Sequence, residues 1–375
     1  MSIRRTISVV CVVGARPNFM KIAPIMRSFN RPDSGVSACL VHTGQHYDQA
    51  MKQSFFDQLG IPEPDIDLGV GGGTHAVQTA DIMTRFEPVL IERKPDFVLV
   101  VGDVNSTIAC ALVASKMGIK VVHVEAGLRS YDRSMPEEIN RVLTDQLSDL
   151  LFTTEESAAE NLKKEAIDSS RVYFVGNVMI DTLCHNLDRA IPAESTLAGR
   201  LDCERYGVVT FHRPSNVDSF DALKNIVETL VEISEELALV FPVHPRTESS
   251  LKKSGLWRTL LDSNILLLEP LGYLELLGLM KSAKVVLTDS GGLQEETTAL
   301  GIPCITIRES TERPITITEG TNVLVGTCSK KILSAFAEVM NHGGKVGSVP
   351  KYWDGNSADR ILETIISNFN WSNRS

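Results

Sequence analysis

The chain has 375 residues, 43% of them hydrophobic and 22% charged, which is typical of a globular protein long enough for two domains. A formal net charge of -10 disfavours nucleic acid and anionic membrane surfaces as partners, because both bind basic surfaces. No apolar stretch is long enough to span a bilayer. We interpret the seven scattered cysteines as reduced, buried side chains of a cytoplasmic protein.

Short apolar runs rich in β-branched residues alternate with helical patterns from the N-terminus onward. In the first half the runs cover residues 6–13, 38–42, 97–101, 120–124, 150–153 and 172–175. In the second half they cover residues 207–211, 238–243, 265–268, 284–288, 304–307 and 322–325. This alternation predicts parallel strands joined by crossover helices.

Two such series predict an α/β protein with two Rossmann-like, doubly wound domains and a cleft between them. A looser stretch at residues 190–199 follows a helical pattern and separates the two series. We therefore expect an N-terminal domain of residues 1–180, closed by a final helix within 357–375, and a C-terminal domain of residues 181–356.

The segment 289–296, DSGGLQEE, follows an apolar run and leads into a helical pattern. The first backbone N–H groups of a helix have no internal acceptor, so they can donate to a phosphate while Glu296, one turn later, bonds a sugar hydroxyl. The predicted donors are Ser290, Gly291 and Gly292. This pattern predicts a nucleotide held by its pyrophosphate. The alternative is an ordinary strand–helix turn whose glycines allow close packing.

Polar residues also follow the predicted strands of the first domain, where a doubly wound sheet binds its ligand. Arg16 and Lys21 follow the first strand and could either face a phosphate or form a solvated basic turn. Asp103 is either a cleft carboxylate or the cap of the next helix. Glu125 is predicted beside Arg129, as part of the cleft or as a structural ion pair.

A third carboxylate and two histidines complete the candidates. Glu137 lies in the first turn of a predicted helix, where dipole and capping rules favour acids in any case. His212 and His244 each follow a strand near an arginine, which suits contact with a phosphate or a leaving group. We predict no metal and no serine nucleophile, because neither ligand spacing nor a G-x-S-x-G elbow occurs. Together the candidates predict acid–base chemistry on a nucleotide-linked substrate.

Several of these segments resemble the non-hydrolysing UDP-N-acetylglucosamine 2-epimerase family in their joint order and spacing. The resembling motifs lie at residues 14–17 with Lys21, 102–103, 123–129, 136–141, 212–213, 289–296 and 311–314. The resemblance implies a two-domain fold like that of glycosyltransferase-B enzymes. It also implies a homodimeric isomerase that needs no cofactor and serves the synthesis of cell-surface polysaccharides.

The resemblance further implies reversible conversion of UDP-GlcNAc to UDP-ManNAc. UDP is eliminated across C1 and C2 to give 2-acetamidoglucal and is added back after the proton returns on the other face. By match, the acid–base and leaving-group residues are Asp103, Glu125, Glu137 and His212. The matched binding residues are Arg16, Lys21, Ser290, Gly291, Gly292 and Arg313 for the diphosphate, Glu296 for the ribose and the backbone near Leu276 for the uracil.

The chain departs from the family pattern at two places. Many bacterial members have His-Arg-Arg-Glu where residues 212–215 read His-Arg-Pro-Ser, and they carry an arginine in the loop that is nearly all glycine here, at 69–74. Those positions form a regulatory second UDP-GlcNAc site in such members, so the departures disfavour allosteric activation here. Residues 45–48 and Pro214 resemble relatives that act on UDP-diacetamido-glucuronic acid, whereas residues 295–296 and 311–314 favour UDP-GlcNAc.

Three other functions are alternatives to the predicted 2-epimerase activity. A hydrolysing epimerase would release free ManNAc and UDP, but those enzymes usually have His-Gly-Gly where this chain has Glu125-Ala-Gly. A glycosyltransferase would leave the C2 hydrogen in place and consume an acceptor. A nucleotide-sugar sensor would bind UDP without turnover, and the many ionisable residues after strands disfavour it.

Overall fold

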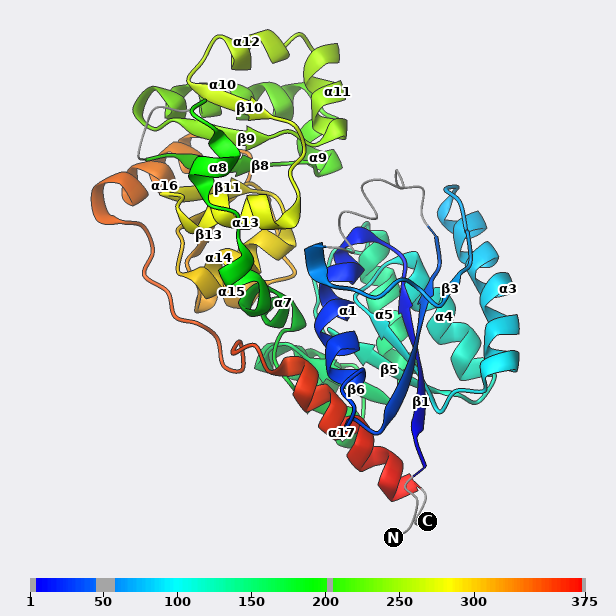
Figure 1. The fold of residues 1–375 in the computed structure, drawn as a ribbon. Coiled ribbons are helices and arrows are strands. Elements are labelled where there is room, and N and C mark those ends of the chain that lie inside the picture. The colour runs from blue at the N-terminus through cyan, green and yellow to red at the C-terminus, as the bar shows by residue number, and fades with distance from the viewer. Residues whose placement is uncertain (1–4, 45–57, 201–204, 373–375) are drawn as a thin grey trace. The chain divides into compact units, whose positions relative to one another are not determined.

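The computed structural model describes residues 5–44, 58–200 and 205–372. The chain divides into two compact units, which are residues 1–185 with 351–375 (unit 1) and residues 186–350 (unit 2). Each unit contains one parallel sheet with interleaved helices, which confirms the predicted pair of doubly wound α/β sheets (Figure 1).

The sheet of unit 1 has seven parallel strands in the order β3-β2-β1-β4-β5-β6-β7. The strands are β1 (Ile7–Val13), β2 (Val36–His42), β3 (Ile66–Asp67), β4 (Phe97–Val101), β5 (Lys120–Val124), β6 (Leu150–Thr153) and β7 (Val172–Phe174). The order reverses between β1 and β4, where Val9 pairs with Phe97. Ligands of doubly wound sheets bind outside the carboxyl ends of the strands at such a reversal.

Helices cover both faces of this sheet, which explains why its strands read as continuous apolar runs. They are α1 (Arg16–Phe29), α3 (His75–Arg93), α4 (Asn105–Lys116), α5 (Pro136–Leu147), α6 (Glu156–Lys164), α7 (Val178–Asn186), α17 (Ser357–Ser372) and a 3-10 turn at Ser169–Arg171. The strand β3 was not predicted, because two residues are too few to show a periodic pattern.

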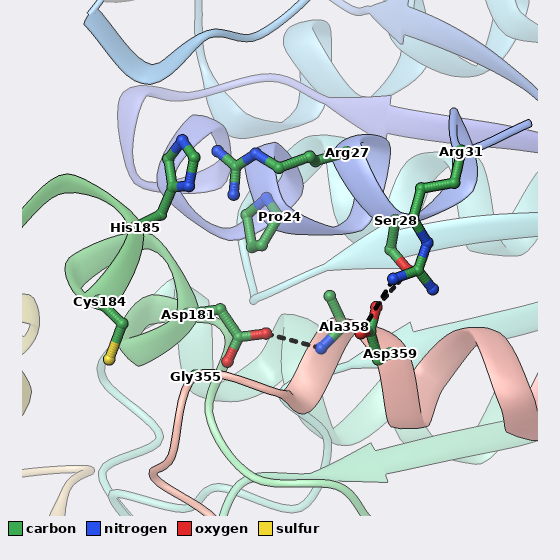
Figure 2. Close-up of a pocket in the computed structure, with 10 residues that line it drawn as sticks. All are labelled: Pro24, Arg27, Ser28, Arg31, Asp181, Cys184, His185, Gly355, Ala358 and Asp359. Atoms are coloured by element: carbon green, nitrogen blue, oxygen red, sulfur yellow. Dashed lines mark hydrogen bonds and ion pairs between the residues drawn. The ribbon is translucent and has the colours of Figure 1, made fainter.

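The C-terminal helix α17 packs against α1 in unit 1. Asp181 of α7 caps it, accepting hydrogen bonds from the backbone N–H groups of Ser357 (3.1 Å) and Ala358 (2.7 Å). Asp359 accepts a hydrogen bond from Ser28 Oγ at 2.7 Å (Figure 2). The pocket between α1, α7 and α17 in Figure 2 contains none of the predicted site residues.

Unit 2 has six parallel strands in the order β10-β9-β8-β11-β12-β13. The strands are β8 (Gly207–Thr210), β9 (Leu239–Pro242), β10 (Ile265–Leu268), β11 (Val285–Thr288), β12 (Cys304–Thr306) and β13 (Asn322–Leu324). The helices are α8 (Ala193–Leu197), α9 (Pro214–Val217), α10 (Phe220–Glu236), α11 (Pro245–Lys253), α12 (Trp257–Leu261), α13 (Tyr273–Lys281), α14 (Gly291–Leu300), α15 (Pro314–Thr318), α16 (Ser329–His342) and a 3-10 turn at Leu187–Arg189. The order reverses between β8 and β11, which predicts a second ligand-binding edge there.

The described cysteines are all free thiols, but they are not all buried. Cys11, Cys110 and Cys304 are buried as expected, whereas Cys184 and Cys328 are exposed, which corrects the sequence interpretation. Both exposed cysteines lie near helix ends, where the local pattern does not define a buried face. Within the described ranges, no helix is long and apolar enough to cross a membrane.

Candidate active site

The predicted acid–base residues of unit 1 surround the carboxyl ends of β1, β4 and β5. Lys21, in the second turn of α1, forms an ion pair with Glu125, the first residue after β5. Only 6% of Lys21 and 5% of Glu125 are exposed, so the pair is internal and not part of a solvated turn. Glu125 has a φ of 74°, a strained conformation that in a non-glycine residue is often found at functional sites.

Arg129 forms no ion pair with Glu125, which was the alternative that the sequence left open. Its Nη2 donates to Asp145 and to Glu165, each at 2.6 Å. The backbone takes positive φ values at both Glu125 and Gly127, so the segment turns between the two side chains. This turn, rather than the four-residue spacing, decides which charges meet.

Asp103 is not the N-cap residue of α4. That position is Val104, whose side chain makes no capping hydrogen bond. The Asp103 carboxylate instead accepts a hydrogen bond from Arg141 Nη2 at 2.5 Å, and Nη1 of the same arginine donates to Glu138 at 2.9 Å. Arg141 is only 3% exposed, so α5 holds Asp103 through a buried guanidinium.

Glu137 differs from the other two carboxylates in having no cationic partner among the described residues. It lies in the first turn of α5 and is half-buried. Its carboxylate forms no hydrogen bond or ion pair with the residues that the structure describes. Within the described ranges, no side chain fixes the direction of the Glu137 carboxylate.

The predicted anion cradle of unit 2 lies between β11 and α14. Gly291 and Gly292 occupy the first two positions of α14, whose N–H groups have no acceptor within the helix. Ser290 is the N-cap residue, and its N–H already donates to the hydroxyl of Thr288 at 2.9 Å. Ser290 can therefore offer a ligand its hydroxyl, while the two glycines offer backbone N–H groups.

Asp289 orients His212 at the end of β8. Its carboxylate accepts the backbone N–H groups of His212 (2.9 Å) and Arg213 (2.8 Å), and one oxygen lies 3.2 Å from His212 Nδ1. Burial would raise the pKa of Asp289, but His212 and these hydrogen bonds lower it below its ordinary value. An ionised Asp289 therefore favours hydrogen on Nδ1 of His212, whose side chain is 42% exposed.

His244 has a local structural role that the sequence did not indicate. Its Nδ1 accepts the backbone N–H of Arg246 at 3.2 Å and thereby caps α11. Its ring lies 5.4 Å from the ring of His212, centroid to centroid. The side chain of Arg246 is engaged by Asp218.

A buried cluster of arginines and glutamates lies beside the cradle. Arg313 Nε is 2.7 Å from Glu295, while Glu312 accepts a hydrogen bond from Arg308 at 2.9 Å and lies 3.7 Å from Arg213. Burial would raise the pKa of Glu312, but the three arginines lower it well below its usual range. A Cβ added at Gly291 would lie 3.0 Å from Glu312 Oε1, which places the cluster against the start of α14.

Glu296 is buried within α14 and accepts a hydrogen bond from Tyr273 at 2.9 Å. Burial raises its pKa to about 7, the tyrosine hydrogen bond opposes this rise, and the charge of Glu295 adds to it. Between pH 4.5, which is the ordinary pKa of a glutamate, and about pH 7, Glu296 keeps its proton in the folded state and loses it in the unfolded state. Glu296 therefore lowers stability progressively as pH rises through this window.

We expect Glu296→Gln to remove this pH dependence. When the pH is raised from about 5.5 to about 8, the free energy of unfolding of the variant should increase by about 2 kcal/mol relative to that of the unchanged protein. Urea unfolding at both pH values measures the difference. The exposed Glu232→Gln serves as the control, and equal pH dependence in all three proteins would contradict the prediction.

For two predicted residues, Leu276 and Arg16, the structure gives the backbone position and no side-chain contact with a predicted site residue. Leu276 lies in the first turn of α13, half-buried, with its N–H donating to Gly272 O at 3.1 Å. Arg16 is the first residue of α1, and its side chain lies outside what the structure describes. Residues 45–48 also lie outside the described ranges. Among described residues, no cluster of three or more His, Cys, Asp or Glu side chains could hold a metal ion.

The family model for UDP-N-acetylglucosamine 2-epimerase matches residues 30–366. The chain belongs to this family. It is an isomerase, and the predicted family resemblance is confirmed. A UDP-N-acetylglucosamine 2-epimerase of Methanocaldococcus jannaschii is 43% identical over 360 residues, covering 94% of this chain and 97% of that protein.

A solved structure of the Methanocaldococcus jannaschii UDP-GlcNAc 2-epimerase, in complex with UDP-GlcNAc and UDP, has a TM-score of 0.88. It is 42% identical and covers 96% of this chain and 100% of its own. A UDP-2,3-diacetamido-2,3-dideoxy-D-glucuronate 2-epimerase of Pseudomonas aeruginosa is 38% identical and covers 95% of this chain and 99% of that protein. Members of this family with different sugar substrates are therefore similar to this chain.

In this epimerase-family chain, several residues that hold the candidates in place were not among the predicted site residues. Arg141 contacts Asp103, Tyr273 contacts Glu296 and Asp289 contacts His212. Asp289 directly follows a strand, and Arg141 lies within the resembling motif at residues 136–141, so both carried a sequence signal. Tyr273 carried none, because its partner Glu296 is 23 residues away on another helix.

Proposed function

We propose that this protein interconverts UDP-GlcNAc and UDP-ManNAc. A base removes the C2 proton as the C1–O bond to UDP breaks, giving 2-acetamidoglucal. The proton then returns to C2 on the opposite face and UDP adds back at C1. The observation that carries the proposal is the group of three carboxylates, Asp103, Glu125 and Glu137, at the carboxyl end of one sheet in a UDP-N-acetylglucosamine 2-epimerase family member.

The proposed proton-transfer groups belong to unit 1. Exchange at C2 with inversion requires groups that act on two faces of the sugar ring. Asp103 and Glu125 are each held by a buried cation, which supports a fixed orientation. Glu137 has no such restraint in the described part of the chain, which supports a group that moves with the substrate. We assign Asp103, Glu125 and Glu137 to the groups that transfer protons to and from C2.

The proposed nucleotide-binding groups belong mainly to unit 2. His212, with Nδ1 toward Asp289, presents Nε2 to the departing UDP. Negative charge develops on UDP as it leaves, so donors at this point stabilise the transition state. The diphosphate donors are Arg16, Lys21, Ser290, Gly291, Gly292 and Arg313, with His244 nearby. Glu296 bonds the ribose, and the backbone near Leu276 contacts the uracil.

Incubation with UDP-GlcNAc in heavy water tests the proposal. We expect deuterium at C2 of both UDP-GlcNAc and UDP-ManNAc, with the nucleotide sugar remaining intact, as measured by NMR and mass spectrometry. Stoichiometric release of free ManNAc and UDP would instead indicate a hydrolysing enzyme. Absence of C2 exchange without an acceptor would favour a transferase, and UDP binding without any turnover would favour a sensor.

The similarity to the Pseudomonas aeruginosa enzyme supports a second candidate substrate, UDP-2,3-diacetamido-2,3-dideoxy-D-glucuronate. Its carboxylate would need a cationic partner that UDP-GlcNAc does not need. We rank it second, because the Methanocaldococcus jannaschii relative is more similar. Comparing kcat/KM for C2 exchange on the two sugars distinguishes them.

A further inference from the structure

The backbone that leads to Asp103 is held by side chains from three different elements. Three successive carbonyls accept these hydrogen bonds: Val101 O from Asn18 at 2.7 Å, Gly102 O from His123 at 2.8 Å and Asp103 O from Asn140 at 2.9 Å. His123 lies on β5 and is fully buried. The turn after β4 is therefore oriented by its surroundings and not only by its own conformation.

The ring of His123 is itself fixed on both sides. Nδ1 lies 2.7 Å from Asp145 Oδ1, and Nε2 lies 2.8 Å from Gly102 O. A carbonyl oxygen can only accept, so Nε2 carries the hydrogen of that bond. Asp145 also accepts from Arg129 at 2.6 Å and from the Gly127 N–H at 3.1 Å. With its carboxylate held from three directions, Asp145 leaves the imidazole no alternative orientation.

The Gly102 peptide lies between two of the proposed proton-transfer groups. Gly102 has a φ of 66°, and a Cβ at this position would lie 2.8 Å from Lys21 Nζ and 3.3 Å from Glu125 Oε2. The next residue is Asp103. A rotation of this peptide would therefore change the direction of Asp103 and its distance from the Lys21–Glu125 pair together.

We propose that His123, oriented by Asp145, is a positioning residue that sets the direction of the Asp103 carboxylate through the Gly102 carbonyl. It touches no reacting atom. The inference rests on the proposed role of Asp103 in proton transfer. It gives the buried pair of His123 and Asp145 a positioning role, although neither residue is proposed to contact the substrate. Small displacements of a reacting group are costly, since a shift of about 1 Å can lower a rate by about 100-fold.

Two substitutions of His123 separate positioning from simple packing. In His123→Gln the side-chain amide can replace the Nε2–H donor to Gly102, whereas in His123→Asn the shorter amide can reach only Asp145. We expect His123→Asn to lower kcat for C2 exchange by about 30- to 100-fold, with KM and the Kd for UDP within about threefold. His123→Gln should recover at least about tenfold of that loss. Thermal melting and UDP titration show that each variant is folded.

The outcomes distinguish this inference from the proposed function. Full kcat in folded His123→Asn, or equal losses in the two variants, would overturn the positioning role while the unchanged enzyme still exchanges C2 hydrogen. Absence of exchange in the unchanged enzyme would overturn the proposed function and this inference with it. If His123→Asn does not fold, His123→Gln decides: kcat within about tenfold supports the role, and a loss above about 100-fold at unchanged UDP affinity rejects it.

Discussion

Asp103→Asn should lower the rate of deuterium incorporation at C2 of UDP-GlcNAc by roughly 10²- to 10⁴-fold, the usual contribution of a general acid or base. The fold should survive, because asparagine keeps an oxygen that can accept from Arg141. The backbone carbonyl of residue 103 also keeps its hydrogen bond from Asn140. Exchange rates followed by NMR in heavy water measure the effect, and UDP titration should give an affinity within severalfold of the unchanged protein.

A matched substitution controls for loss of a carboxylate elsewhere in unit 1. Asp81 is exposed on α3 and is not one of the proposed site residues, so Asp81→Asn should leave exchange unchanged. Full retention of exchange in Asp103→Asn would reject its assignment to proton transfer. A loss of exchange together with UDP binding and a lowered melting temperature would instead indicate damage to the fold.

Lys21→Met should destabilise the protein by about 3–5 kcal/mol, because it leaves the carboxylate of Glu125 buried without its cation. The double variant Lys21→Met/Glu125→Gln should lose less than the sum of the two single variants. We expect an interaction energy on the order of 2 kcal/mol from urea unfolding of the four proteins. These measurements need no substrate, so they examine the ion pair separately from catalysis.

An exposed lysine provides the comparison for Lys21. Lys224 lies 3.7 Å from Glu228 on α10, and about half of its side chain is exposed. Lys224→Met should change the free energy of unfolding by less than about 0.5 kcal/mol. If Lys21→Met were equally mild, the ion pair with Glu125 would contribute little to stability, and Lys21 would act in the proposed binding of the diphosphate alone.

Local patterns in the sequence determined most of the secondary structure. Apolar runs and the helical segments between them predicted the strands of both sheets to within a few residues, because burial on both faces of a parallel sheet leaves a continuous apolar signal. The strand β3 was not predicted, because its two residues are too few to show a periodic pattern.

The sequence by itself also determined which residues follow strands, and therefore which candidates lie at a ligand-binding edge. Only the tertiary structure decided how their charges pair. Glu125 meets Lys21 and not Arg129, and Asp103 meets Arg141 from α5, because partners are chosen by backbone turns and helix placement between residues distant in sequence. Burial likewise depends on the whole fold, so the raised pKa of Glu296 and the lowered pKa of Glu312 could not be inferred from neighbouring residues.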